Sequence, residues 1–258
     1  MRRSIVLLLA AAVTACATSP LGRPQLKLFP EAELAQMGAA SYAEIKKETK
    51  TSSDASVNRY VRCIANAITA QTGGNWEVTV FADDQANAFA LPGGKIGVYT
   101  GLLDVAENQD QLAAVMAHEV AHVLADHGNE RVSTSFAAQS GLELVSAVSG
   151  AGQSATGQKV MSLLGLGTQV GVLLPFSRAQ ESEADILGLQ LMARSGFRPE
   201  ASVALWRNMA ERSEGQPPEF LSTHPSHGSR IGALQENMPK ARQLYEQARG
   251  AGRTPSCG

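Results

Sequence analysis

The sequence predicts an α+β fold that is mainly helical and contains a small β-sheet. Long stretches place apolar residues three and four positions apart, as amphipathic helices do, and two short stretches rich in β-branched residues resemble strands. The chain of 258 residues is long enough for one domain with a sizeable core. Its composition, 44% hydrophobic and 18% charged with a formal net charge of -2, offers no basic surface that would predict nucleic-acid binding.

Residues 1–15 are predicted to be a lipoprotein signal peptide. A short basic segment precedes the apolar residues 5–13, which are too few to span a bilayer but suit a secretory signal. The letters VTAC that follow resemble a bacterial lipobox, in which the cysteine is lipidated, so Cys16 is the predicted anchor. A plain signal peptide with a chance cysteine is the alternative. Because Ala17 stands where an aspartate would favour the inner membrane, we expect attachment to the outer membrane, facing the periplasm.

The rest of the chain is predicted to consist of a Pro- and Gly-containing tether over residues 16–30 and a single domain over residues 31–258. Within that domain Cys63 and Cys257 form an even pair in an oxidising compartment, which favours a disulfide. Two unpaired thiols are the alternative, because the sequence does not show whether the two residues come close enough to bond.

The first half of the domain is predicted to be helical and then to form strands. Residues 31–70 follow a helical pattern, and residues 76–82 alternate as a strand does. Residues 95–101 form a second predicted strand, which follows the turn letters LPGG. We expect this second strand to lie at the edge of the sheet, where an extended peptide could add to it by backbone pairing.

A long apolar helix is predicted to begin just before Leu112. Asn108, followed three residues later by Gln111, makes a capping pair, and Gly128 is the predicted end of the helix. The insertion over residues 128–175 is rich in Ser, Gly and Ala. A helical hairpin, a lid and a partly mobile segment all remain open for it.

A second capping pair, Ser177 with Gln180, predicts a helix that ends at Gly196. Another helix is expected to start near Pro199. It is followed by the loop STHPSHGSR and by a terminal helix with the letters ALQENMPKARQLYEQAR. The predicted domain therefore consists mostly of helices.

The apolar helix carries the letters HEVAH, which place His118 and His122 one turn apart on one face, as two ligands of a single metal ion require. A core helix with ordinary buried histidines is the alternative, but the apolar stripe of this helix points away from them. Glu119 lies between these two faces, which suits a general base for a metal-activated water. His127 returns to the apolar side of the continuous helix and is predicted to be structural or to lie at the end of the helix.

A catalytic zinc site needs a third protein ligand, and the letters ESEAD supply a candidate in Glu181. Asp185 lies on the same face and could hydrogen-bond an imidazole, while Glu183 points nearly the opposite way. A solvated first helical turn would explain these acids equally well if HEVAH were absent. His224 and His227 could approach the metal, contact a substrate or cap a helix.

Four motifs occur in order: NAFALPGGKIGVYTGLL, AAVMAHEVAHVLADH, SRAQESEADILGL and STHPSHGSRI. In these motifs the sequence resembles the gluzincin metallopeptidases of the HtpX and CAAX-prenyl-protease type, and more narrowly their soluble, lipoprotein-anchored periplasmic members. The resemblance implies a zincin-like domain in which the HExxH helix and a second, glutamate-bearing helix flank a zinc cleft. It implies one zinc ion (Zn2+) held by His118, His122 and Glu181, with Glu119 as the catalytic residue.

Four more residues match positions that recur in the family motifs and are expected to support or regulate the site: Asp185, Arg178, His224 and Arg230. The membrane-embedded relatives have several transmembrane helices. This sequence lacks them, so processing of prenylated proteins is not implied.

The leading hypothesis is a zinc-dependent endopeptidase that cleaves misfolded or unassembled bacterial envelope proteins. The alternative is a latent or chaperone-like binder that uses the same cleft with little proteolysis, for example because His224 closes the fourth metal position. A purely structural zinc site is disfavoured, since such sites usually have four protein ligands and are rich in cysteine. The expected partners are unfolded envelope proteins and, through Cys16, the membrane.

Overall fold

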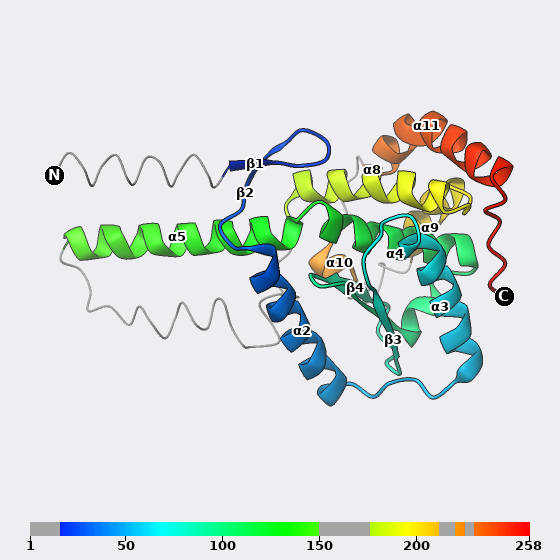
Figure 1. The fold of residues 1–258 in the computed structure, drawn as a ribbon, viewed down its shortest axis with the longest axis horizontal. Coiled ribbons are helices and arrows are strands. Elements are labelled where there is room, and N and C mark those ends of the chain that lie inside the picture. Colours follow the sequence, from blue (N-terminus) through cyan, green and yellow to red (C-terminus); the bar gives the residue numbers. More distant parts are fainter. Residues whose placement is uncertain (1–15, 150–175, 212–219, 225–229) are drawn as a thin grey trace.

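The computed structural model describes residues 16–149, 176–211, 220–224 and 230–258 (Figure 1). The predicted signal peptide, part of the insertion, and His227 lie outside the described residues. Among the residues that are described, no helix combines the length and the apolar character needed to cross a membrane.

The helical pattern over residues 31–70 corresponds to two helices, α2 (Glu31–Glu48) and α3 (Ala55–Thr69). The break between them ends at Asp54, whose carboxylate accepts hydrogen bonds from the backbone N–H groups of Ser56 and Val57 at 2.7 and 3.1 Å. An aspartate in this position starts a new helix because it satisfies N–H groups that have no partner within the helix. This cap was not part of the sequence-based expectation.

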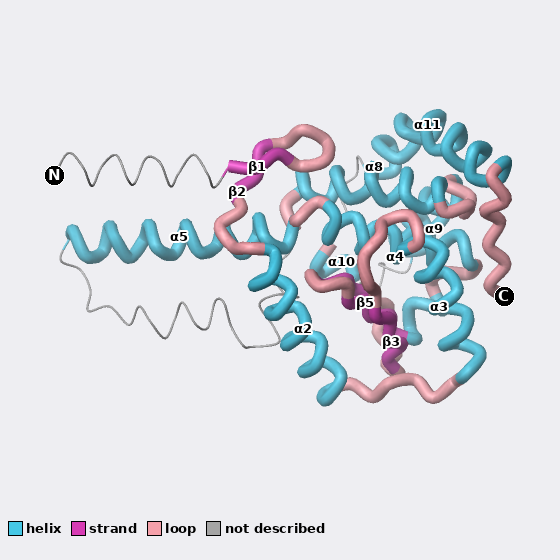
Figure 2. The backbone as a smooth tube through the Cα atoms, in the orientation of Figure 1, coloured by secondary structure: helices cyan, strands magenta, loops and turns pink. Residues whose placement is uncertain are grey.

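The sheet has three strands, β3 (Glu77–Phe81), β4 (Ala88–Leu91) and β5 (Lys95–Tyr99), in the order β3-β5-β4. β5 is parallel to β3 and antiparallel to β4. Figure 2 shows the strands in magenta, with β3 and β5 labelled among the cyan helices. The prediction that residues 95–101 form the edge strand was therefore wrong, because β5 lies in the middle. The edge strand next to β5 on one side is β4. It is short and shows almost no alternation of apolar and polar residues, so the sequence pattern did not predict it.

The core is built around α4 (Gln109–Leu124), which carries the HEVAH letters and contacts α3, α8, α9 and β4. Every residue from position 110 to position 122 is buried. Asn108 caps the helix as expected, accepting from the N–H groups of Asp110 and Gln111. The apolar stripe and the histidine face are thus both inside the molecule, on different sides of the same helix.

The predicted end of this helix at Gly128 was wrong. α4 stops at Leu124, and Asp126 has a φ of 54°, a left-handed conformation that breaks the helix. A new helix, α5 (His127–Ser149), starts immediately and includes Gly128 in its first turn. Figure 1 shows α5 extending away from the body of the molecule, so the first part of the insertion is helical.

The remaining helices are α8 (Arg178–Arg194), α9 (Glu200–Glu211), α10 (Phe220–Thr223) and α11 (Arg230–Gly250). α8 begins with the capping box predicted from the sequence, in which Ser177 and Gln180 exchange hydrogen bonds. It is followed by Gly196 with a φ of 89°, the conformation expected just past a helix end. α8 runs alongside α4 and brings the ESEAD letters to the HEVAH helix (Figure 1).

Residues 16–30, the predicted tether, include an antiparallel hairpin, β1 (Cys16–Thr18) and β2 (Pro24–Leu26), that is attached to the body. The buried side chain of Gln25 donates to the carbonyl of Ala125 at 2.7 Å. Arg23 and Lys27 pair with Glu130 and Asp126, respectively. Because these partners follow the end of α4, polar contacts fix the hairpin over that end of the helix.

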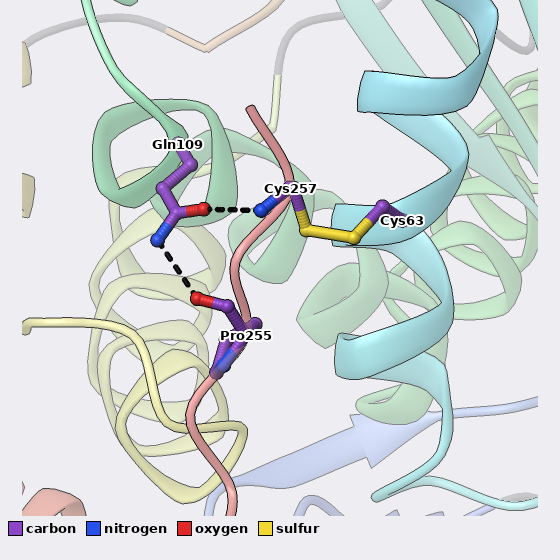
Figure 3. The surroundings of a disulfide bond; sticks show 4 residues. All are labelled: Cys63, Gln109, Pro255 and Cys257. Atoms are coloured by element: carbon purple, nitrogen blue, oxygen red, sulfur yellow. Dashed lines mark hydrogen bonds between the residues drawn. A yellow bond between two sulfur atoms is a disulfide. The ribbon is translucent and has the colours of Figure 1, made fainter.

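At the opposite end of α4 the structure joins Cys63 of α3 to Cys257 of the terminal segment in a disulfide, with 5.5 Å between their Cα atoms (Figure 3). Gln109, the first residue of α4, accepts a hydrogen bond from the N–H of Cys257 at 2.9 Å and donates to the carbonyl of Pro255 at 3.0 Å. The last residues of the chain are thereby held against the start of the HEVAH helix.

Candidate metal centre

Two helices bring the three predicted ligands together. His118 and His122 project from α4 with their Nε2 atoms 3.1 Å apart. Glu181, from the first turn of α8, places one carboxylate oxygen 3.5 Å from His118 Nε2 and the other 3.4 Å from His122 Nε2. All three side chains are buried. The two imidazoles, spaced i, i+4 on one helix, and the carboxylate from a neighbouring helix therefore converge on one point.

His224, the residue after α10, joins this group. Its Nδ1 lies 2.9 Å from Glu181 Oε1 and 3.3 Å from His118 Nε2, and its Nε2 lies 3.2 Å from Glu119 Oε1. The ring stacks on Phe220 with 4.4 Å between centroids, which holds it in place. One ligand atom from each of His118, His122, Glu181 and His224 fits within 4.8 Å of the others.

The donor set fits a zinc ion. Imidazole nitrogens and a carboxylate oxygen are the ligands that zinc takes in catalytic sites. The nitrogens of His118 and His122 face each other, an arrangement that a cation between them would explain. Among the described residues, the buried oxygens Glu181 Oε2 and Glu119 Oε1 lie near cationic or imidazole nitrogens but make no hydrogen bond of normal geometry, although buried polar atoms usually do.

Asp185 and Arg230 support the other side of His118. Asp185 Oδ1 lies 3.1 Å from His118 Nδ1 and accepts hydrogen bonds from Arg230 Nε and Nη2 at 3.0 and 2.8 Å. Arg230 Nη1 lies 3.0 Å from Glu181 Oε2, and the guanidinium stacks over the ring of Trp206. Asp185 therefore occupies the place from which a carboxylate can fix the tautomer of a ligating imidazole.

Charges in this buried cluster favour a cation. Burial and the charge of Arg230 act to lower the pKa of His118, but hydrogen bonds to Asp185 and Glu181 outweigh them and raise it to about 9. Burial alone would raise the pKa of Glu181, but hydrogen bonds from three histidines hold it well below its usual range. Burial lowers the pKa of His122, which keeps this imidazole neutral and able to act as a ligand. Burial raises the pKa of Glu119.

The family model for peptidase family M48 matches residues 51–238, which include the HEVAH and ESEAD letters and His224. The chain belongs to peptidase family M48. M48 is a family of zinc metallopeptidases. The family assignment of the chain and its buried donor set therefore both indicate zinc.

The relatives of this M48 chain include mitochondrial and bacterial proteases. It is 39% identical over 192 residues to the mitochondrial metalloendopeptidase OMA1 of Schizosaccharomyces pombe, covering 72% of this chain and 55% of the relative. The corresponding human protein is 32% identical over 244 residues, covering 88% and 45%. The β-barrel assembly-enhancing protease of Escherichia coli is 28% identical over 229 residues, covering 83% and 45%. The chain thus spans about half the length of these relatives. Their names do not specifically indicate the HtpX and CAAX-prenyl-protease type.

His127 lies elsewhere than the sequence indicated. The prediction placed it on the apolar side of a continuous helix, but the break at Asp126 turns it back toward the group of metal-ligand residues. Its Nδ1 lies 2.9 Å from Nδ1 of His122, and its Nε2 lies 3.1 Å from Glu183 Oε2. His127 contributes no atom to the four-atom ligand group, so it contacts a ligand residue without being one.

Arg178 is not brought to the site. It is the exposed first residue of α8 and, in the part of the chain that the structure describes, does not line the cavity beside the metal cluster. The other residues that the M48 motifs indicated, Asp185, His224 and Arg230, all lie at the cluster.

A cavity of about 880 Å³ opens beside the cluster. Glu119, His122 and His224 line it, together with β4 and the apolar side of α2, which includes Leu34. Arg131 of α5 lines it as well, with its guanidinium 4.1 Å from the ring centroid of Phe176. The sequence did not identify Arg131 or the α2 wall, because neither belongs to a motif.

Proposed function

We propose that this M48 chain is a zinc-dependent endopeptidase, and the position of Glu119 carries the proposal. Its carboxylate is buried, adjoins the metal ligands through His224 at 3.2 Å and faces the cavity. A protein that only binds peptides, or one that holds a structural zinc, has no need for a buried carboxylate in this position beside three or four ligands.

Each group has a definite task in this reaction. His118, His122 and Glu181 would hold zinc, which would supply a Lewis acid and lower the pKa of water to about 7. Glu119 accepts the proton of the attacking water on a carboxylate oxygen and delivers it to the nitrogen of the leaving amine. The raised pKa of Glu119 makes it a better proton carrier near neutral pH than an exposed glutamate.

β4, and not β5, is the strand to which we expect an extended substrate to add. The N–H of Tyr99 donates to the carbonyl of Asn87, and in this register Phe89 and Leu91 also pair with β5. The backbone groups of Ala88 and Ala90 therefore face away from β5, and both residues line the cavity. Recognition through backbone pairing depends little on side chains, which suits unfolded or unassembled proteins.

We also propose that the chain acts in the bacterial envelope, on misfolded or unassembled proteins, and is anchored to the outer membrane through Cys16. The lipobox-like letters support the anchor, and the disulfide suits an oxidising compartment. The name of the Escherichia coli relative, a β-barrel assembly-enhancing protease, supports an envelope substrate, whereas the names of the OMA1 relatives refer to mitochondria.

A latent enzyme is the second candidate, and His224 favours it. Catalytic zinc sites use three protein ligands and keep the fourth position open. His224 reaches both Glu181 and Glu119 and so occupies the region where a substrate carbonyl and water would meet.

The deciding experiment measures zinc content and cleavage of an unfolded outer-membrane β-barrel protein by the wild type and by Glu119→Gln. We expect both proteins to contain one zinc ion per chain and only the wild type to cleave. The wild type could hold zinc and still cleave no faster than Glu119→Gln. If the zinc-loaded His224→Ala variant also cleaved no faster than Glu119→Gln, only a binding function would be left. A wild type that does not retain zinc would overturn the site itself.

A further inference from the structure

The side of His122 that faces away from the metal cluster begins a chain of buried polar contacts. His122 Nδ1 lies 2.9 Å from His127 Nδ1, and His127 Nε2 lies 3.1 Å from Glu183 Oε2. His127 is fully buried and Glu183 is 4% exposed. The two side chains have no part in the reaction described above.

The chemistry of imidazole gives this series of hydrogen bonds one direction. His122 Nε2 faces the cluster, 3.1 Å from His118 Nε2 and 3.4 Å from Glu181 Oε1. When this nitrogen ligates a metal, the remaining proton of His122 is on Nδ1 and must be donated. His127 Nδ1 accepts it, so the proton of His127 is on Nε2 and is donated to the carboxylate of Glu183. A carboxylate at the far end thereby orients the ligand through a second imidazole.

Glu183 is in turn held by the β1–β2 hairpin. Arg23 Nε donates to Glu183 Oε2 at 3.2 Å, and the N–H of Leu21 donates to Glu183 Oε1 at 3.1 Å. The guanidinium of Arg23 also makes two contacts with Glu130, one of them 2.6 Å long. The hairpin that follows Cys16 is therefore connected to a metal ligand through three successive side chains.

We propose that His127 and Glu183 are positioning residues for His122, and that Arg23 of the hairpin completes their arrangement. The hairpin is then part of the support of the metal site and not merely the segment between an anchor and a domain. Asp185 and Arg230 support His118 from the other side, so each histidine ligand has its own carboxylate. The proposal rests on zinc occupying the cluster, as the proposed function does, but not on proteolysis.

The test is the zinc affinity of the full chain, measured by competition with a chromophoric chelator. His127→Phe removes the acceptor for His122, and Glu183→Gln removes the terminal charge. Arg23→Gln removes the side-chain contact from the hairpin and leaves the one from the Leu21 N–H. We expect His127→Phe and Glu183→Gln to weaken zinc binding by about 10- to 100-fold and Arg23→Gln to weaken it less. In the Co2+-substituted proteins, we expect the visible absorption bands of the first two variants to shift.

Arg198→Gln is the matched control. Arg198 also pairs with a buried carboxylate, that of Asp110 at 2.9 Å, but at the opposite end of α4. We expect this variant to lose stability and to bind zinc with the affinity of the wild type. Circular dichroism and thermal unfolding of the zinc-free proteins show whether each variant is folded, and Glu183→Gln keeps the volume of the side chain should His127→Phe fail to fold.

Zinc affinities within a factor of two of the wild type in folded Glu183→Gln and Arg23→Gln would overturn the proposal. So would an equal loss of affinity in Arg198→Gln, because it would mark a general effect of stability. If the wild type binds zinc and cleaves while these variants are unchanged, only the present inference fails. If the wild type does not bind zinc, the proposed function fails with it.

Discussion

Gly188 of α8 lies directly against the backbone of His118 in α4: a Cβ atom on Gly188 would be 2.9 Å from both the Cα and the N of His118. No real Cβ makes such contacts, so only glycine lets the two helices approach this closely. The approach matters for the site because Glu181 and Asp185 come from α8, whereas both histidine ligands come from α4.

We therefore predict that Gly188→Ala pushes α8 away from α4, lowers the free energy of unfolding by about 1–3 kcal/mol and weakens zinc binding. Urea denaturation of the zinc-free protein and chelator competition measure the two effects. Gly232→Ala is the control, since Gly232 lies within α11 and a Cβ there would have no atom within 4 Å. This control should stabilise the protein by about 0.4–1 kcal/mol. Equal behaviour of the two variants would contradict the steric explanation.

His224→Ala separates an active enzyme from a latent one. Because His224 contacts both Glu181 and Glu119, we expect its removal to open the fourth metal position and to raise the rate of cleavage, while zinc binding is weakened but retained. Steady-state cleavage of an unfolded β-barrel protein, normalised to zinc content, measures the change. A lower rate at full zinc occupancy would instead assign His224 a contact with the substrate.

The attachment of the hairpin is predicted to depend on pH. Burial acts to raise the pKa of Glu130, but the hydrogen bond from Arg23 outweighs it and lowers this pKa below its ordinary value. Burial likewise opposes the lowered pKa of Glu183, which results from hydrogen bonds that include those of His127 and the Leu21 N–H. A carboxylate with a lowered pKa in the folded state stabilises the protein above its ordinary pKa. This stabilisation is lost as the pH falls through the lowered value.

We therefore expect Arg23→Gln to reduce the free energy of unfolding by about 1 kcal/mol at pH 7, since Arg23 is partly exposed. The difference from the wild type should shrink once the pH falls below about 4.5. Urea denaturation of the zinc-free proteins across this range measures it. A difference that stays constant with pH would mean that packing of the hairpin, and not charge, explains the loss.

Removing the disulfide is predicted to lower stability more than any single hydrogen bond does. It closes a loop with a sequence separation of 194 residues and holds the terminal segment against Gln109. We expect the Cys63→Ser, Cys257→Ser double variant to lose about 2–5 kcal/mol of unfolding free energy. A phosphine reductant should produce the same loss in the zinc-free wild type and no further loss in the double variant. A wild type insensitive to the reductant under denaturing conditions would contradict the bond.

Local signals in the sequence predicted much of the fold because the interactions behind them span only a few residues. The Asn108 cap, the capping box of Ser177 with Gln180, and the helix end before Gly196 all depend on hydrogen bonds or backbone conformations within one turn. The four-residue spacing of His118 and His122 is a property of one helix in the same way. These features could be read without knowing what packs against them.

Features that depend on distant partners could not be predicted in this way. β4 has four residues and little alternation, so the sequence did not show that it displaces β5 from the edge of the sheet. One left-handed residue, Asp126, ended α4 four residues early and turned His127 toward His122. A helical-wheel argument assumes a continuous helix, and it fails as soon as one backbone torsion leaves the helical range.

By itself, the sequence determined the chemistry of this protein: two imidazoles and a glutamate on one helix, and a carboxylate pair on another. The tertiary structure decided what surrounds them. It placed Arg230 between Glu181 and Asp185, brought His224 into the ligand group, and connected Glu183 to a hairpin some 160 residues earlier in the chain. The physical reason is the sequence separation of the interacting residues. Helix spacing is set by hydrogen bonds between near neighbours, whereas these contacts exist only after the whole core has packed.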